Sequence, residues 1–213
     1  MKIVEKEHCF LIKDFFEPSI YAGFTKPDLS GQLPESIYKA LSFLDRKFEV
    51  SFMDQIHSAD VNFIDKPGMY RCDAIFTNKA NNLLVVKTAD CLPLLFSGKK
   101  HIGVVHMGWR GAAAGIIDNL NIDFPGSKVI ASAGLRKCCY EFTKDLKEDK
   151  LKPFLNKGYF DVIEFTKQGL VDQGLREQDF LDLRECSFCS KRDFFSYRKT
   201  KTDKRTLSFV LKV

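Results

Sequence analysis

Eight short apolar runs, each bounded by turn formers or charged residues, recur along this chain of 213 residues. They are rich in β-branched and aromatic residues, a composition typical of strands. The runs cover residues 8–12, 48–53, 61–64, 74–77, 83–86, 102–106, 129–133 and 207–213. A chain with this many strands is expected to form a layered domain around one or more sheets.

Apolar residues at helical spacing predict four helices between these runs, at residues 34–48, 110–120, 145–155 and 166–174. The strands outnumber the helices, and short turns join several successive strands, so antiparallel or mixed pairing is expected beside any βαβ unit. We therefore predict an α/β fold of the layered α+β type, with a mixed, largely antiparallel sheet packed by helices. The length fits a single domain over residues 1–213.

The charge balance is mildly basic, because 33 Lys and Arg residues and 28 Asp and Glu residues give a net charge of +5. Basic residues are densest at 191–205. For such a segment, a strand edge protected by lysines is a commoner explanation than a basic strip that binds nucleic acid. The charge also suits a small anionic substrate such as phosphate.

Neither a membrane span nor export is expected. No apolar stretch reaches about 18 residues, and the start of the chain lacks the apolar segment and cleavage site of a secretory signal. The seven cysteines are an odd number, which favours reduced thiols in a cytoplasm.

Two polar clusters, TADC at 88–91 and HMGWRG at 106–111, interrupt the ends of apolar runs. The first cluster contains Cys91 and the second contains His106, and His57 completes a set of three candidate ligands. Each of the three taken alone is typical of a structural residue. As a set they offer nitrogen and sulfur ligands that suit Zn²⁺, and three protein ligands leave a fourth position open.

Two rival hypotheses use the same residue types. Cys91 could be a nucleophile with His106 as its base, oriented by Asp90 or a carbonyl, and N–H groups near residues 108–111 would then form an oxyanion pocket. The other rival is a zinc site built from Cys138-Cys139 and Cys186-Ser-Phe-Cys189. For that second cluster we favour packing, because adjacent cysteines rarely bind one metal comfortably.

Several polar residues beside these segments are candidates for catalysis or binding. Arg110 and Arg198 could bind phosphate through their guanidinium groups, and Arg110 could also serve in catalysis. Gln55, at the start of QIHS, joins them as a substrate-binding candidate. Asp90 and Glu141 are the candidates for proton transfer or ligand orientation, although Glu141 could equally be a carboxylate at a helix start.

Six segments in this order carry a resemblance to a known family: QIHSADV, CDAIFTN, KTADCLPLLF, VVHMGWRGAAAGI, RKCCYEF and FFSYR. The chain resembles the laccase-domain family, also called YfiH-like or multicopper polyphenol oxidase-like, from about Phe24 onward. The resemblance implies a single α/β domain with one zinc ion held by His57, Cys91 and His106. Zinc is the expected ion, with copper as the second choice.

The resemblance also implies an activity. Family members phosphorolyse adenosine, inosine and methylthioadenosine and deaminate adenosine, so the expected partners are a purine nucleoside and phosphate. We expect neither nucleic acid nor membrane as a partner, and a monomer or small homo-oligomer. The family resembles toxin deamidases with a Cys–His pair, which keeps the thiol-hydrolase hypothesis open. Oxidation of phenols by several coppers fits poorly with only four histidines in the chain.

The chain departs from the family pattern in three places. Family members usually carry F-x-T-R-x-G-G-V-S, whereas this chain has Lys26 for the arginine and lacks the glycine pair. Ser132-Ala133 replaces a Gly-Pro, and Lys204-Arg205 stands where a Gly-Arg is usual. The three presumed metal ligands are intact, so we expect the zinc to be kept and the substrate preference to differ.

Overall fold

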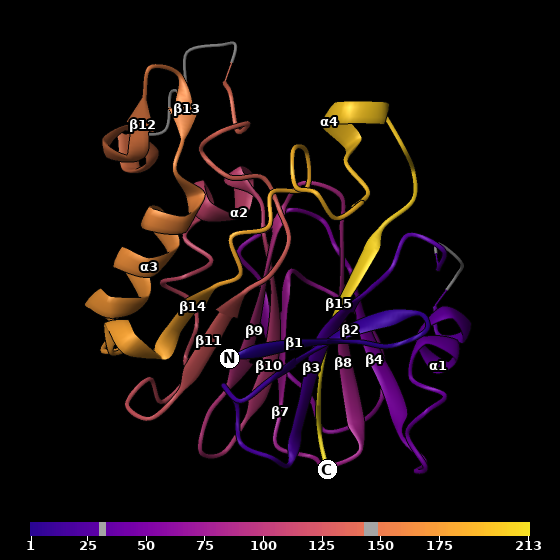
Figure 1. The fold of residues 1–213 in the computed structure, drawn as a ribbon. Coiled ribbons are helices and arrows are strands. Elements are labelled where there is room, and N and C mark those ends of the chain that lie inside the picture. Colours follow the sequence, from indigo (N-terminus) through magenta and orange to yellow (C-terminus); the bar gives the residue numbers. More distant parts are fainter. Residues whose placement is uncertain (30–32, 143–148) are drawn as a thin grey trace.

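The computed structural model describes residues 1–29, 33–142 and 149–213. Two mixed sheets form the centre of the fold (Figure 1). The first has seven strands in the order β1 (Lys2–Glu5), β2 (Cys9–Lys13), β3 (Ile20–Thr25), β15 (Thr206–Lys212), β8 (Asn82–Thr88), β4 (Glu49–Asp54) and β6 (Gly68–Arg71). The second has six in the order β14 (Phe180–Asp182), β11 (Lys128–Ala131), β9 (Leu92–Ser97), β10 (Ile102–Met107), β7 (Ala74–Thr77) and β5 (Val61–Phe63).

Most neighbouring strands pair antiparallel. The parallel pairs are β4 with β6 and with β8, β5 with β7, and β11 with β14. The predicted fold class is therefore confirmed, although the strands divide between two sheets. A short hairpin of β12 (Leu155–Asn156) and β13 (Tyr159–Phe160) stands apart from both.

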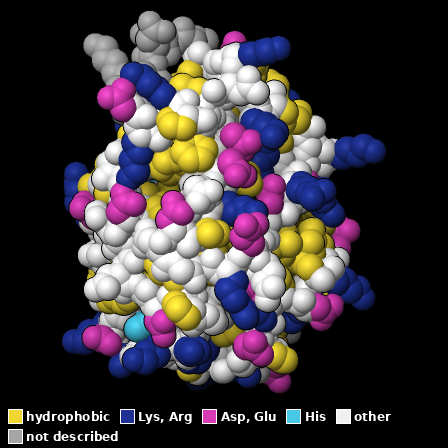
Figure 2. Space-filling model, turned by 90° about the vertical axis from the view of Figure 1, so that its left-hand side faces the viewer, with side chains coloured by type: hydrophobic (Ala, Val, Ile, Leu, Met, Phe, Trp, Pro, Cys, Tyr) yellow, Lys and Arg dark blue, Asp and Glu magenta, His cyan; other side chains and the backbone are white. Residues whose placement is uncertain are grey.

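The four helices are α1 (Glu35–Ala40), α2 (Trp109–Ala114), α3 (Val162–Asp172) and α4 (Tyr197–Thr200), with 3₁₀ turns at Asp149–Phe154 and Glu177–Asp179 in the described part of the chain. In Figure 1, α1 lies on one side of the sheets and α3 on the other. On the face drawn in Figure 2, basic, acidic and apolar side chains are interspersed. Among the described helices, none is long and apolar enough to cross a membrane.

Two-sided burial explains the continuous apolar runs. Along β8, Leu84 and Val86 pack between the two sheets, whereas Leu83 and Val85 pack on the opposite face, against the cluster that contains Ile37 of α1. A strand buried on both faces gains from apolar residues at every position rather than at alternate ones. These runs therefore reveal a strand without revealing which sheet it joins.

Helix lengths are the main difference from the sequence expectations. The helices predicted at 34–48 and 110–120 are shorter, and Gly115 ends α2 because it adopts the left-handed conformation at φ 87°. Helix α3 starts earlier than residue 166, because the side chain of Asp161 accepts a hydrogen bond from the backbone N–H of Glu164. Part of the helix predicted at 145–155 lies outside the described residues, and Asp149–Phe154 is a 3₁₀ turn.

Candidate metal centre

Strand pairing brings His57, Cys91 and His106 together from separate elements. Cys91 directly precedes β9, and Leu92 of β9 pairs with Met107 of β10, so Cys91 lies beside the end of β10 that carries His106. His57 follows β4, which runs parallel to β8, and Cys91 follows β8. Parallel strands end at the same edge, so both residues leave the first sheet at that edge.

The three side chains are close enough to share one ion. Their ligand atoms all lie within 4.8 Å of one another. The Cys91 Sγ is 4.0 Å from the His57 Nε2, and the two imidazole rings meet edge-on with centroids 4.8 Å apart. A Cβ atom at Gly108 would come within 3.0 Å of the Cys91 Sγ, so only glycine leaves the sulfur unobstructed there.

The buried residue Asp73 supports the positions of His57 and His106, and the sequence analysis did not identify Asp73. Its buried carboxylate accepts hydrogen bonds from the backbone N–H groups of Ile56, His57 and Ser58 and from the Ser58 hydroxyl, at 2.7 to 3.2 Å. It also accepts from the His106 Nδ1 at 2.7 Å. The CDAIFTN segment contained the signal, an aspartate immediately before a fully buried strand.

The Asp73 contact selects the nitrogen that His106 can offer a metal. Because Nδ1–H donates to the carboxylate, Nε2 is the nitrogen available as a ligand. A carboxylate behind a ligating histidine is the usual support of a zinc site. The residues present therefore fit a zinc ion with three protein ligands and one open position.

Neighbouring groups shift the pKa values of Cys91 and His106. Burial alone would raise the pKa of the Cys91 thiol, but hydrogen bonds from His106 and His57 outweigh burial and lower the pKa from 9.0 to about 6. Burial alone would lower the pKa of His106, but hydrogen bonds with Asp73 and Cys91 raise it to about 9. A thiolate beside an imidazolium suits both a metal ligand and a nucleophile.

The lowered pKa predicts how metal-free protein reacts with iodoacetamide. The thiolate is the reactive form, so alkylation of Cys91 should rise with pH and reach half its maximum rate near pH 6. Peptide mass spectrometry after timed labelling checks this. The internal control is Cys9, whose pKa burial raises to about 11 and which should stay unmodified at that pH. A Cys91 midpoint near 9 would contradict the described contacts.

A cavity of about 1170 Å³ opens beside the three ligands. His57, Cys91 and His106 are part of its wall, together with the aromatic side chains of Phe52, Trp109, Tyr140 and Tyr197. Its basic residues are Lys87, Arg110, Arg198, Lys201, Lys204 and Arg205, and its acidic ones are Asp54, Asp90 and Asp203. A basic cavity with aromatic walls suits an anionic ligand and a planar ring.

Two of the other candidate residues help to build this cavity. Gln55 lines it and bonds through its side-chain amide to both backbone groups of Lys87. Asp90 accepts from the hydroxyls of Ser187 and Ser196 and from the backbone N–H of Arg198, at 2.6 to 2.9 Å. Asp90 thus joins the β8–β9 connection to the start of α4.

The two candidate arginines differ in how they are held. The Arg110 side chain is exposed and lies over the Trp109 ring, 4.8 Å from the ring centroid. Arg198 donates through Nη1 to the carbonyl oxygens of Cys139 and Glu141 at 2.9 and 2.8 Å. Glu141 itself is exposed and lies outside the lining of the cavity, so its backbone rather than its carboxylate supports the site.

Two residues at this site have an unusual backbone conformation. His57 has φ 60° and Asp90 has φ 102°, values that side-chain-bearing residues seldom adopt. Strained conformations of this kind persist where the surroundings determine them, and they cluster at functional sites. Here the hydrogen bonds to Asp73 and from Ser196 supply that constraint.

Residues 21–212 match the family described as multi-copper polyphenol oxidoreductase laccase. The chain belongs to this family. A purine nucleoside phosphorylase from Aquifex aeolicus is 34% identical over 155 residues, covering 65% of this chain and 70% of that protein. Purine nucleoside phosphorylase Cj1217c from Campylobacter jejuni is 30% identical over 189 residues, covering 83% of this chain and 82% of that protein.

The crystal structure of YlmD from Geobacillus stearothermophilus shares the laccase-family fold of this chain, with a TM-score of 0.82. The two sequences are 21% identical, and the alignment covers 98% of this chain and 97% of the YlmD chain. The similarity of fold therefore extends over both sheets and the elements that carry His57, Cys91 and His106.

Proposed function

We propose that this chain is a zinc-dependent purine nucleoside phosphorylase that also deaminates adenosine. The observation that carries the proposal is the convergence of His57, Cys91 and His106 at the wall of a basic, aromatic cavity. The names of the relatives from Aquifex aeolicus and Campylobacter jejuni agree with it. Residues 1–213 would act as one catalytic domain.

In phosphorolysis, a phosphate oxygen bonds to the ribose C1′ while the bond to the purine nitrogen breaks, giving the free base and ribose 1-phosphate. Arg110 is free to approach the phosphate because it is exposed at the cavity, and its planar guanidinium suits two phosphate oxygens. Trp109 and the exposed Tyr197, which both line the cavity, offer aromatic surface to the purine. Zinc, when bound by the three ligands, would supply a Lewis acid.

The carboxylates take different roles in this proposal. Asp90 is engaged by three donors, so we assign it to orienting Arg198 and α4 rather than to moving a proton. Glu141 stays a prediction for proton transfer. Gln55, which directly follows β4, and Arg198 of α4 line the cavity and are the proposed substrate-binding residues beside Arg110.

Adenosine incubated with metal-loaded protein tests the proposal. Adenine and ribose 1-phosphate should appear only when phosphate is present, and inosine should appear with or without it. Chromatography of the products measures both reactions, with chelator-treated protein as the control. If neither product forms with protein of verified zinc content, the proposed function is wrong.

Replacing Arg110 by alanine should separate the two reactions. Loss of a charge-assisted contact to phosphate is expected to lower kcat/KM for phosphate about 10- to 100-fold. Deamination of adenosine uses no phosphate and should change less than about threefold on the same reasoning. Arg46→Ala is the matched control, because Arg46 is exposed, bonds to Asn81 and lies outside the cavity lining. Equal losses in both reactions would assign Arg110 to another role.

A metal-free hydrolase is the second candidate, and the lowered pKa of Cys91 beside His106 favours it. In that case Cys91 would attack an acyl carbon and His106 would protonate the leaving group. Polyphenol oxidation fits less well, since several copper sites would need more than the four histidines of this chain.

A further inference from the structure

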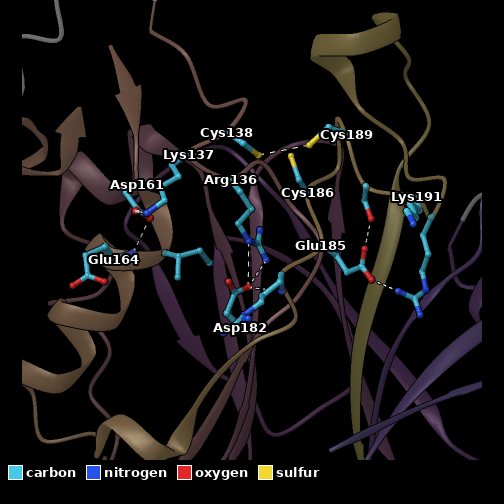
Figure 3. Close-up of a pocket in the computed structure, with 14 residues that line it drawn as sticks. Arg136, Lys137, Cys138, Asp161, Glu164, Asp182, Glu185, Cys186, Cys189 and Lys191 are labelled. Carbon is cyan, nitrogen blue, oxygen red and sulfur yellow. Dashed lines mark hydrogen bonds and ion pairs between the residues drawn. The ribbon is translucent and has the colours of Figure 1, made fainter. Parts of the chain in front are cut away.

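Four cysteines converge outside the His57–Cys91–His106 centre. The sulfur atoms of Cys138, Cys139, Cys186 and Cys189 all lie within 4.8 Å of one another, and those of Cys138 and Cys189 are 3.6 Å apart. Figure 3 shows Cys138, Cys186 and Cys189 directed toward one another at the rim of a second cavity, of about 740 Å³. All seven cysteines of the chain carry free thiols.

Backbone pairing places these cysteines together although Cys139 and Cys186 are 47 positions apart in the sequence. Strands β11 and β14 run parallel, so the segments that follow them leave the sheet at one edge. Gly134 and Cys186 continue this pairing as a parallel bridge, and the Ser187 N–H donates to the Gly134 carbonyl at 3.0 Å. The pairing of the backbone in these two segments therefore brings the thiols together.

Packing does not account for the cluster. Cys138 and Cys189 are exposed, which differs from the packing role expected for this cluster from the sequence. Only Cys186 is buried. Exposed cysteines contribute little to a hydrophobic core, and their thiols are accessible to oxidation. The convergence of these cysteines therefore needs an explanation other than packing.

The spacing of the sulfurs suits a tetrahedral ion. Zinc–sulfur bonds are about 2.3 Å long, which puts two sulfurs of one site about 3.8 Å apart. The observed 3.6 Å is close to that edge length and far from a disulfide bond of about 2.0 Å. Four thiolates and no other ligand form a closed site, the arrangement of structural zinc.

Backbone dipoles favour the thiolate form of Cys186, one member of this cluster. Burial alone would raise the pKa of Cys186, but the N–H groups of Cys189, Phe188 and Arg136 are directed at its sulfur and lower the pKa below its ordinary value. Such N–H donors stabilise the negative sulfur that a metal ion requires.

We propose that Cys138, Cys139, Cys186 and Cys189 bind a second, structural divalent cation of thiophilic character, zinc in the first place. The ion would tie the segment after β11 to the segment after β14. Both segments support the wall of the first cavity. The Cys139 carbonyl accepts from the Arg198 Nη1, and the Ser187 hydroxyl donates to Asp90. The proposed ion thereby holds Arg198 and Asp90 in place from outside the cavity.

Cobalt binding to purified, reduced protein tests this site, and the Cys91→Ser variant isolates it from the first one. Cys91→Ser should bind one equivalent of Co²⁺ and show intense thiolate-to-cobalt absorption. Adding Cys138→Ser and Cys189→Ser should abolish that equivalent and the absorption. Both added positions are exposed, so serine there leaves no cavity. Adding Ser190→Ala instead is the matched control, which keeps all four thiols and should keep the metal.

Two results would overturn the proposal. One is a Cys91→Ser protein with reduced thiols that binds no Co²⁺. The other is a Cys138–Cys189 disulfide found by mass spectrometry in native protein quenched with an alkylating agent. Circular dichroism of every variant confirms that it is folded. No enzymatic assay enters this experiment, so its outcome is independent of the proposed phosphorylase activity.

Discussion

Cys91→Ser is expected to lower the zinc content of the purified protein by about one equivalent and to abolish turnover. A serine hydroxyl stays protonated at neutral pH and is a poor zinc ligand beside His57 and His106. Loss of even a supporting residue lowers metal affinity or activity about 10- to 100-fold, so removal of a ligand should exceed that range. Elemental analysis and the adenosine assays measure the two effects.

The same variant separates the two candidate functions. In the hydrolase hypothesis, Cys91 is a nucleophile, so serine would abolish turnover without changing the metal content. Cys72→Ser is the matched control, since Cys72 is buried away from the cavity lining and should leave the zinc content unchanged. If the Cys91→Ser variant retains its zinc, the assignment of Cys91 as a metal ligand is wrong.

Asp73→Asn is expected to be the most destabilising single exchange at the site. In the wild type, the Asp73 carboxylate accepts hydrogen bonds from backbone N–H groups such as that of His57. The asparagine side chain would present its own N–H group to some of these donors, and the His106 imidazolium would lose its negatively charged partner. Removing one partner of a buried charged pair costs about 3–5 kcal/mol, a large share of the 5–15 kcal/mol typical of folded proteins. Denaturant unfolding at pH 7 measures the loss.

The destabilisation should depend on pH. Burial alone would raise the pKa of Asp73, but the hydrogen bond to His106 and those from Ser58 lower the pKa from 3.8 to about 2. The carboxylate therefore contributes its full stability above about pH 4, and that contribution is lost as the pH falls toward 2. The difference in the free energy of unfolding between the wild type and Asp73→Asn should become smaller over the same pH range.

Asp60→Asn provides the control for this exchange. Asp60 lies near Asp73 but is exposed, and a surface substitution of this kind changes stability by about 0.5 kcal/mol or less. A similar effect of both exchanges, or a loss below about 1 kcal/mol for Asp73→Asn, would show that the carboxylate does not anchor the His57 segment.

Local patterns were enough to predict most of the central strands. The run at 102–106 corresponds to β10 (Ile102–Met107), and that at 74–77 corresponds to β7 (Ala74–Thr77). They were recognisable because burial on both faces leaves an uninterrupted apolar run. The edge strands β1, β6 and β14 and the hairpin of β12 and β13 were missed, since exposed or half-buried positions in them break that pattern. The buried strands β3 and β9 were missed as well, and they contain Gly23 and Pro93, residue types that weaken a strand pattern.

The candidate ligands could be selected from residue type, because imidazole and thiolate are the groups that zinc prefers. Asp73 could not be selected in the same way. Its role depends on the turn at 56–58 folding over the start of β7, a long-range contact that periodicity does not encode. The four cysteines were named together from residue type as a rival zinc site, but packing was favoured for them, because only the parallel pairing of β11 and β14 shows that the two pairs meet.

The amino-acid sequence alone determined the strand-rich α/β class, the mild positive charge and the candidate ligands His57, Cys91 and His106, since these follow from composition, residue type and local pattern. Only the tertiary structure decided that His57 arrives from the β4 side of one sheet and His106 from β10 of the other. The reason is physical. Side-chain periodicity reports which residues are buried, whereas the register between distant strands decides which polar ends meet.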